Sequence, residues 1–383
     1  MTVTRPQGFR AAGVAAGLKS TGAADVALVV NDGPDDAAAA VFTTNRFPAA
    51  PVVWSRQVLS TGRLRAVVLN SGGANACTGP EGFQDTHATA EHTAAALGLG
   101  AIDVAVASTG LIGMRLPMEK LTAGVTAAAQ GLSADGGPDA ARAIMTTDSV
   151  PKTAVQERGG WTVGGMAKGA GMLAPSLATM LVVLTTDAVV PAEVLQPALR
   201  TATGLSFERV DSDGCLSTND TVIVMANGAS GVTPSAEEFT EALTAVCTDL
   251  AMQLLADAEG STKDIAITVR NAASVQDALT AGRACARNNL LKTALFGNDP
   301  NWGRVLAAIG TTDAAFAADQ VDVTINGVTV CRGGSIGDPR EGVDLTGRAI
   351  TIDVDLRAGA EQATIWTNDL SIAYVHENSA YST

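Results

Sequence analysis

Residues 164–184 read GGMAKGAGMLAPSLATMLVVL and combine two patterns in a single stretch. A glycine-rich loop carries Lys168 and runs through Pro175 to Thr179, and an apolar run follows directly. A short apolar run that contains β-branched residues is typical of a buried strand, which we expect over 180–184. The stretch therefore predicts a lysine-bearing loop that leads into a strand of the core.

Segments of strand and helix character alternate along the rest of the 383 residues. Short runs rich in β-branched residues predict further strands at 27–30, 52–54, 66–69, 104–107, 222–225, 265–269, 321–325, 350–354 and 363–366. Apolar residues at helical spacing predict helices over 85–97, 236–258 and 274–295, and another that begins near Pro191. The mixed order predicts α/β layers, with no domain boundary visible in the composition.

The composition limits the class of protein. Hydrophobic residues make up 46% and charged residues 17%, which excludes intrinsic disorder because enough apolar surface is present to build a core. Lys and Arg number 25 against 39 Asp and Glu, so the net charge of −14 argues against a nucleic-acid partner. The N-terminus lacks a signal-peptide layout, the apolar runs are too short to span a bilayer, and the five cysteines form no CxxC pair. We therefore expect a cytoplasmic protein with no membrane partner.

Nucleotide binding is one possible role for the glycine-rich loop. A phosphate-binding loop of the Walker A type requires Ser or Thr directly after its lysine, but Gly169 follows Lys168 here. A dinucleotide-binding loop requires a strand before it and a helix after it, whereas a strand is predicted after this loop. Both nucleotide-binding motifs are therefore disfavoured.

Self-cleavage between Ala178 and Thr179 is the other possibility. The small Ala178 leaves its carbonyl open to attack by the Thr179 hydroxyl, and an acyl shift followed by hydrolysis would release Thr179 as a new N-terminus. The freed α-amino group, with a pKa of roughly 7.7–8.0, could act as general base for its own hydroxyl. The pattern alone leaves a tight loop before a strand as the simpler alternative.

Blocks spread along the whole chain carry a family resemblance. Residues 168–180 (KGAGMLAPSLATM) resemble the self-cleavage signature of the ornithine acetyltransferases, the bifunctional glutamate N-acetyltransferases of arginine biosynthesis. Further matching blocks, in the order of the family, are 70–79 (NSGGANACTG), 108–113 (STGLIG), 145–148 (MTTD), 211–214 (DSDG), 219–221 (NDT), 296–304 (FGNDPNWGR) and 377–383 (ENSAYST). One departure is Gly73, where the family pattern has Asn.

The resemblance implies both a fold and a reaction. The fold is a layered αββα sandwich of the kind found in self-processing aminopeptidases and ornithine acetyltransferases. Cleavage would give fragments 1–178 and 179–383, associated as two copies of each. The reaction would move the acetyl group of N2-acetyl-L-ornithine to L-glutamate through an acetyl-threonine on Thr179, with Thr109 and Gly110 forming the oxyanion hole. No cofactor is expected, and acetyl-CoA is a second candidate donor.

The resemblance also implies substrate contacts. Lys168 is expected to bind the α-carboxylate, and Glu259, at the end of the predicted helix, the distal amino group. The register leaves open which of Thr146 and Thr147 contacts the substrate, and Asn378 and Thr383 match the C-terminal contacts. A further polar cluster has spacings unlike those of a calcium-binding loop, so we expect turn-forming roles and no metal for Asp211, Asp213, Asn219 and Asp220.

Three alternatives stay open. A self-processing amidohydrolase or aminopeptidase would share the nucleophile and pass the acyl group to water. A binding protein without catalytic activity would keep one intact chain. An ornithine acetyltransferase could also serve a secondary-metabolite pathway.

Overall fold

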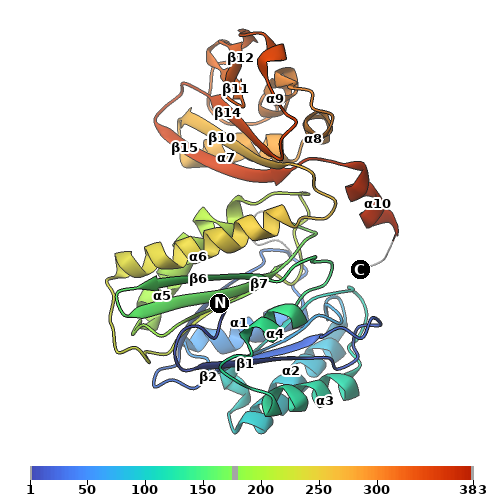
Figure 1. Ribbon diagram of the computed structural model, residues 1–383, viewed down its shortest axis with the longest axis vertical. Coiled ribbons are helices and arrows are strands. Elements are labelled where there is room, and N and C mark those ends of the chain that lie inside the picture. The colour runs from blue at the N-terminus through green and yellow to red at the C-terminus, as the bar shows by residue number, and fades with distance from the viewer. Residues whose placement is uncertain (1, 175–179, 381–383) are drawn as a thin grey trace.

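The computed structural model describes residues 2–174 and 180–380. In Figure 1 two sheets are stacked in the lower part of the molecule, and a third sheet lies above them. The N-terminal part of the chain, in blue and green, forms the lower part, and the C-terminal part, in orange and red, forms the upper part. The two lower sheets carry most of the residues that the sequence analysis singles out.

The first sheet comes from the N-terminal part of the chain. Its strand order is β1 (Phe9–Val14), β2 (Val26–Asn31), β4 (Ala66–Asn70) and β5 (Val104–Ser108). The strands β4 and β5 are parallel, and the other neighbours are antiparallel. The helices that contact this sheet are α1 (Ala50–Val58), α2 (Gly79–Leu97), α3 (Met118–Gln130) and α4 (Gly137–Ala143).

The second sheet has at its centre the strand that follows the glycine-rich loop. Its strand order is β3 (Ala37–Phe42), β9 (Thr221–Ala226), β8 (Leu181–Thr186), β7 (Trp161–Lys168) and β6 (Lys152–Arg158). The strands β8 and β9 are parallel, and the other pairs are antiparallel. The two helices that pack on this sheet are α5 (Ala192–Leu205) and α6 (Ala236–Ala256).

Side chains that alternate along β8 and β9 show how the layers pack. Leu181, Val183 and Ile223 belong to the hydrophobic core shared with the first sheet. Val182 and Val224 belong to the core shared with α5 and α6. All residues of both strands are buried, as expected for a sheet covered on its two faces. The layers therefore run from α5 and α6 through two sheets to α2 and α3, which confirms the predicted αββα sandwich (Figure 1).

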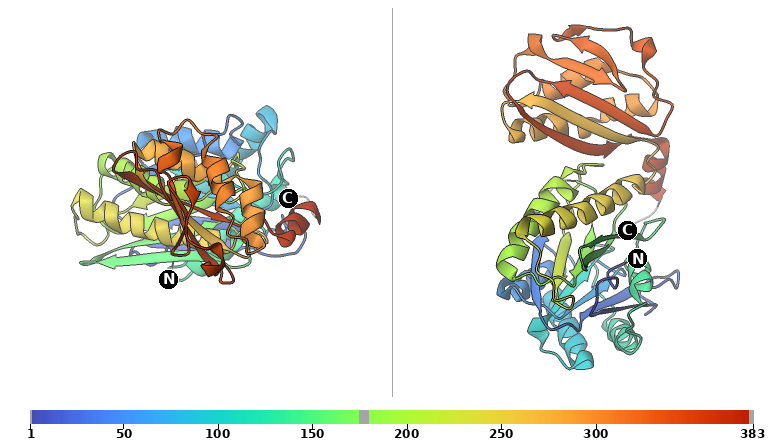
Figure 2. Two further views of the ribbon diagram at one scale, coloured as in Figure 1. Left: turned by 90° about the horizontal axis from the view of Figure 1, so that it is seen from above. Right: turned by 60° about the vertical axis from the view of Figure 1, so that its left-hand side comes forward.

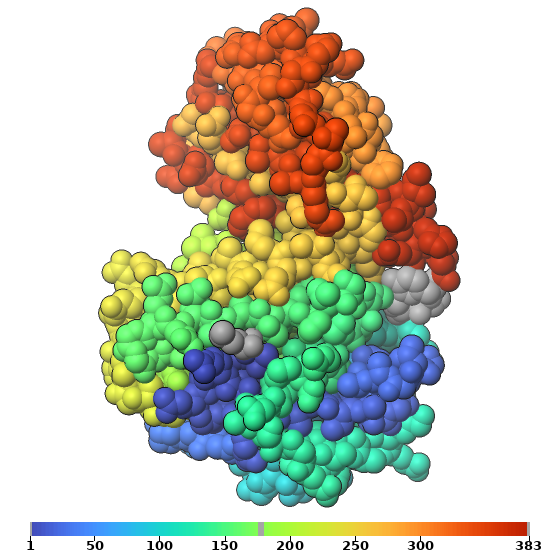
Figure 3. All heavy atoms as spheres, viewed as in Figure 1, coloured from blue at the N-terminus to red at the C-terminus, as the bar shows by residue number. Residues whose placement is uncertain are grey.

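Residues 264–368 form a C-terminal lobe with a hydrophobic core of its own. Its mixed sheet has the order β13 (Ser335–Ile336), β12 (Val328–Arg332), β11 (Asp322–Ile325), β14 (Ala349–Asp355), β10 (Asp264–Ala272) and β15 (Glu361–Asn368). The helices of the lobe are α7 (Val275–Ala286), α8 (Asn289–Phe296) and α9 (Trp302–Ile309). Figure 3 shows this lobe, in orange and red, seated on the sandwich. No change in composition marks this boundary, because both cores use the same aliphatic residues.

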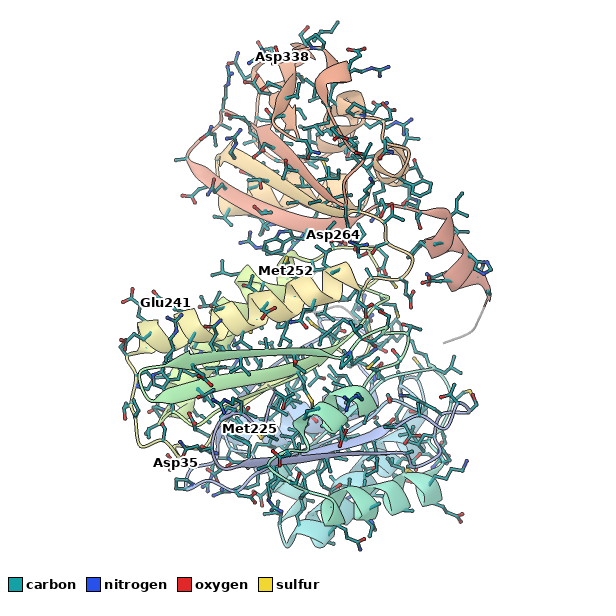
Figure 4. The ribbon with its side chains drawn as sticks, viewed as in Figure 1. Asp35, Met225, Glu241, Met252, Asp264 and Asp338 are labelled. Atoms are coloured by element: carbon teal, nitrogen blue, oxygen red, sulfur yellow. The ribbon has the colours of Figure 1, made fainter. Side chains whose placement is uncertain are left out.

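The lobe meets the sandwich beside α6. Asp264, at the start of β10, accepts a hydrogen bond of 2.8 Å from the Arg348 guanidinium, which also donates to the Ala256 carbonyl at the end of α6. Figure 4 labels Asp264 and Met252 of α6 near this junction. After the lobe, α10 (Ile372–Ala380) leads the chain back toward the sandwich, as Figure 2 shows from two sides. Among the described residues, no helix is both long and apolar enough to cross a membrane.

Two predicted elements were wrong. The expected strand at 52–54 belongs to α1, where Pro51 lies in the first turn and Trp54 and Val58 face the core. The expected helix at 274–295 is two helices: the first ends at Ala286 with Arg287 as its C-cap, and Asn288 caps the second by accepting the Leu291 N–H. Short 3₁₀ turns complete the description, at Leu59–Thr61, Ala101–Asp103, Phe207–Arg209, Ala318–Gln320 and Arg340–Gly342.

Several strands were missed because they are rich in Ala and Gly. The strand β3 reads AAAAVF, and β7 contains Gly164 and Gly165. A Cβ on Gly165 would lie 2.8 Å from the Leu184 side chain and 3.0 Å from the Leu250 side chain of α6. The small residues therefore allow α6 to pack closely on the sheet, and this requirement outweighs their low strand propensity.

Candidate active site

The ends of strands from both lower sheets meet beside the glycine-rich loop. Thr109 follows β5 of the first sheet, and Lys168 is the last residue of β7 in the second. The Lys168 ammonium lies 3.4 Å from the Thr109 hydroxyl and 2.6 Å from the Thr146 hydroxyl. Residues separated by 59 positions in the sequence are thus in contact.

Thr109 and Gly110 form a constrained turn. The Thr109 N–H donates to the Asn70 carbonyl at 3.0 Å, and the Thr109 carbonyl accepts from Gly73 at 3.0 Å. Gly110 has a φ of +130°, and a Cβ there would lie 2.8 Å from the Gly73 nitrogen. Only glycine fits such a position without strain. No acceptor within residues 2–174 or 180–380 takes the Gly110 N–H, so the Thr109 hydroxyl and this N–H are available to bind an oxyanion.

Lys168 is buried, with only 2% of its surface exposed. Burial lowers the pKa of Lys168 from its ordinary value, although the nearby Asp148 carboxylate opposes this effect. A buried cation at a strand end is suited to bind a carboxylate, because little water competes for it. The two candidate threonines have different surroundings. Thr146 contacts Lys168, whereas Thr147 lines a neighbouring cavity.

Asp148 is a residue to which the sequence analysis assigned no role, although it lies in the matching block 145–148. Its carboxylate accepts hydrogen bonds from the Gly169 N–H at 2.6 Å and the Thr146 N–H at 2.9 Å. Burial disfavours its charged form, but the charges of Lys168 and Lys152 outweigh this effect and lower the pKa of Asp148 to about 2. Asp148 therefore stays ionised. Its two hydrogen bonds fix the backbone at Thr146, which contacts Lys168, and at Gly169, which follows Lys168.

Glu259 was expected at the end of α6, but it lies just beyond the helix. The helix ends at Ala256 and Asp257 is its C-cap, so Glu259 belongs to the turn that follows. Its N–H donates to the Ala170 carbonyl at 2.9 Å. A Cβ on Gly171 would lie 2.6 Å from a Glu259 carboxylate oxygen, so the carboxylate packs directly against the glycine-rich loop.

A cavity of about 480 Å³ lies beside Glu259. Its walls come from the 147–149 loop, the turn after α6 and one residue of α10, and its lining includes Thr147, Ser149, Asp257, Glu259 and Glu377. Thr147 on its wall follows Thr146, which contacts Lys168. Three of the lining side chains are carboxylates, those of Asp257, Glu259 and Glu377, so the cavity is suited to bind an amino group.

The remaining expected site residues belong to the predicted cleavage point and to the C-terminal segment. Ala178, Thr179 and Thr383 lie outside the described residues. Asn378 is exposed on α10, and its side-chain amide donates to the Tyr374 carbonyl at 3.0 Å.

Polar side chains of the 211–220 segment bond to other parts of the chain. Asp211 pairs with the Arg287 guanidinium at 2.7 Å, and the Asp213 carboxylate accepts from the Leu173 N–H at 3.2 Å. The Asn219 amide donates to the Ala74 carbonyl and the Ser108 carbonyl. Asn219 therefore fixes the end of β5, the strand that precedes Thr109. The sequence block 219–221 marked this residue without revealing that role.

Asp220 lies next to the start of β8. It accepts the Met180 N–H at 3.1 Å, one residue after the predicted cleavage point. Burial raises the pKa of Asp220 well above its ordinary value. Within residues 2–174 and 180–380, no group of three or more His, Cys, Asp or Glu side chains is arranged to hold a metal ion.

Comparisons with known proteins agree with these observations. The chain is 64% identical to the arginine biosynthesis bifunctional protein ArgJ of Thermobifida fusca, over the full length of both chains. It is 63% identical to the protein of the same name from Streptomyces coelicolor, again over the full length of both. A solved structure of ornithine acetyltransferase from Mycobacterium tuberculosis, in complex with ornithine, matches 47% of this chain and 96% of its own at 63% identity, with a TM-score of 0.45. The ArgJ family model matches residues 10–383, and the chain therefore belongs to the ArgJ family.

Proposed function

We propose that this chain is an acetyltransferase that moves the acetyl group of N2-acetyl-L-ornithine to L-glutamate in arginine biosynthesis. The observation that carries the proposal is the buried Lys168 ammonium, within hydrogen-bonding distance of the hydroxyls of both Thr109 and Thr146. It combines a carboxylate-binding cation with a candidate oxyanion hole at the loop that leads to Thr179. Membership of the ArgJ family and the names of the full-length relatives support the same reaction.

The proposed nucleophile is Thr179, released as an N-terminus by cleavage after Ala178. The products would be fragments of 178 and 383 − 178 = 205 residues that remain associated, two copies of each in the assembly. The Thr179 amine would take the proton of its own hydroxyl while the hydroxyl oxygen attacks the acetyl carbonyl carbon. Thr109 and Gly110 would donate to the oxyanion of the tetrahedral intermediate.

Collapse of that intermediate completes the transfer. The bond between the acetyl carbon and the ornithine nitrogen breaks, the nitrogen takes the proton held by the Thr179 amine, and ornithine leaves. The amino group of glutamate then attacks the acetyl-threonine ester and releases the Thr179 hydroxyl. Donor and acceptor are both α-amino acids, so one carboxylate subsite can serve both half-reactions.

The proposed substrate contacts combine the geometry of the described residues with the family resemblance. Lys168 and Thr146 would bind the α-carboxylate, and Glu259 the distal amino group of the donor. Thr147 lines the cavity beside Glu259. Asn378 and Thr383 would contribute from the C-terminal segment. We place the enzyme in the cytoplasm, and the name "bifunctional" of the relatives supports acetyl-CoA as a second donor.

Intact-mass measurement of the purified protein under denaturing conditions tests the cleavage. The wild type is expected to give two fragments that divide at Thr179, and the Thr179→Ala variant a single chain. Two fragments from the variant, or one active unbroken chain from the wild type, would contradict the proposal.

An assay of ornithine release with and without glutamate tests the reaction. Transfer requires glutamate for steady turnover and yields acetylglutamate. Equal release in the absence of glutamate would instead identify a hydrolase.

A further inference from the structure

Lys152 has no part in the proposed reaction, yet its charged side chain is fully buried near the site. It begins β6, is 0% exposed, and pairs across the strand ladder with Ala167. Its ammonium lies 2.7 Å from an Asp148 carboxylate oxygen and 2.6 Å from an Asp257 carboxylate oxygen. Buried ion pairs are often no more stabilising than apolar side chains of similar size, so another role has to be considered for this lysine.

The Asp148 side of this arrangement holds the carboxylate subsite, which consists of Lys168 and Thr146. Asp148 accepts the N–H groups of Thr146 and Gly169 and lies 3.9 Å from the Lys168 ammonium. Both residues of the subsite are therefore positioned by the carboxylate that Lys152 holds.

The second carboxylate bound by Lys152, that of Asp257, lies near Glu259, which forms the proposed amino subsite. Asp257 accepts the Ser149 N–H at 3.0 Å and also the Ser149 hydroxyl. Two residues later the Glu259 N–H donates to the Ala170 carbonyl at 2.9 Å. The turn that carries Glu259 is thus attached at one end to Lys152 and at the other to the glycine-rich loop.

These contacts close into a ring. It passes from Lys152 to Asp148, to the Gly169–Ala170 segment, to Glu259, and through Asp257 back to Lys152. The cavity of about 480 Å³ lies on this ring, with Asp257 and Glu259 among its lining residues. Within this ring, the Lys152 side chain contacts both Asp148 and Asp257.

We propose that Lys152 is a positioning residue that sets the distance between the carboxylate and amino subsites and so selects the side-chain length of the acetylated amino acid. The proposal rests on the proposed function, because it assigns the two subsites to the two ends of one substrate. One methylene group is worth about 10–200-fold in discrimination when a pocket is rigid. A misplacement of about 1 Å in such a site costs about 10²-fold.

The test compares acetyl donors of different length. The kcat/KM of transfer to glutamate is measured for N2-acetylornithine, for N2-acetyllysine, which is one methylene longer, and for N2-acetyl-2,4-diaminobutyrate, which is one shorter. The variant Lys152→Met/Asp257→Asn removes one positive and one negative charge and leaves Asp148 beside Lys168. Its matched control, Arg142→Met/Asp139→Asn, removes an exposed ion pair of 2.9 Å within α4, with the same charge change.

The wild type and the control are expected to prefer acetylornithine strongly. The Lys152 variant should lose about tenfold or more of that preference, through a higher KM for acetylornithine with a smaller change for the other two donors. Unchanged preference in a folded, cleaved variant would overturn the inference. The milder Asp257→Asn variant, whose amide can still accept from Ser149, decides the question if the double variant fails to fold.

The two proposals fail in different ways. A wild type that moves no acetyl group from acetylornithine to glutamate contradicts the proposed function, and the inference falls with it. A wild type that transfers acetyl but does not distinguish the three donors contradicts only the role of Lys152. Loss of activity towards all three donors in equal proportion would show that the ring serves stability alone, and would also overturn the inference.

Discussion

The Lys168 ammonium donates a hydrogen bond of 2.6 Å to the Thr146 hydroxyl, and this contact distinguishes Thr146 from its neighbour Thr147. The sequence places two threonines side by side in a matching block and offers no means of choosing between them. The structure turns one toward the buried cation and the other toward the cavity beside Glu259. The contact thus favours Thr146 over Thr147 as the threonine of the proposed carboxylate subsite.

Thr146→Val should therefore weaken substrate binding more than Thr147→Val. The valine keeps the shape of the side chain but removes a partner of a buried charge, and hydrogen bonds to charged groups contribute about 1.5–3 kcal/mol. We expect KM for acetylornithine to rise about tenfold or more, with kcat changed less. Steady-state kinetics of both variants check this expectation, and a larger effect of Thr147→Val would refute it.

Gly110→Ala should reduce kcat. At a φ of +130°, the new Cβ would lie 2.8 Å from the Gly73 nitrogen, so the turn that aims the Thr109 hydroxyl and the Gly110 N–H must move. Loss of one oxyanion donor typically costs about 10²–10³ in kcat. Gly113→Ala is the matched control, because Gly113 also has a positive φ of 81° but has nothing within 4 Å of a new Cβ. Equal kcat values for the two variants would count against the oxyanion role.

Gly171→Ala should displace Glu259. The added Cβ would lie 2.6–2.8 Å from atoms of the Glu259 carboxylate, which is closer than real Cβ contacts allow. We expect KM for acetylornithine to rise in the same direction as in Glu259→Gln. Gly204→Ala, with nothing within 4 Å of its Cβ, is the control.

Two measurements are needed for this variant. A denaturing gel must first show that Gly171→Ala is still cleaved, because Gly171 lies in the processing loop. Unaltered KM in a cleaved Gly171→Ala enzyme would argue that Glu259 does not contact the donor.

Asp211 should make stability depend on pH. Burial raises its pKa to about 6, although the Arg287 guanidinium beside it opposes this effect. The folded protein then binds more protons than the unfolded chain between about pH 4 and 6. The stability associated with this proton is present below about pH 4 and is lost as the pH rises to 6, by up to about 3 kcal/mol.

Asp211→Asn removes this titration. The free energy of unfolding of the wild type relative to the variant should therefore fall as the pH rises from 4 to 6.5. Denaturant unfolding in the uncleaved Thr179→Ala background measures the difference on a single chain. A difference that is constant over this range would contradict the assignment.

Local patterns predicted those features that depend on neighbours in the sequence. The helix predicted from residue 236 begins there as α6, and Ser235 and Glu238 form both hydrogen bonds of a capping box at its start. The apolar run at 180–184 marks β8 because buried strands need branched side chains on both faces. By contrast, β3 and β7 escaped notice because their Ala and Gly residues are explained only by the helices packed on them.

The sequence by itself predicted α/β layers from its strand and helix patterns, and its family resemblance implied the αββα sandwich and the chemistry proposed for Thr179, because local patterns and a thirteen-residue signature are properties of contiguous residues. Only the tertiary structure decided that Thr146 contacts Lys168 and that Lys152 joins Asp148 to Asp257. Lys152 and Asp257 are 105 positions apart, and their contact depends on how α6 packs against β6. The distance between two subsites is set by the packing of whole layers, and no local pattern of residues encodes it.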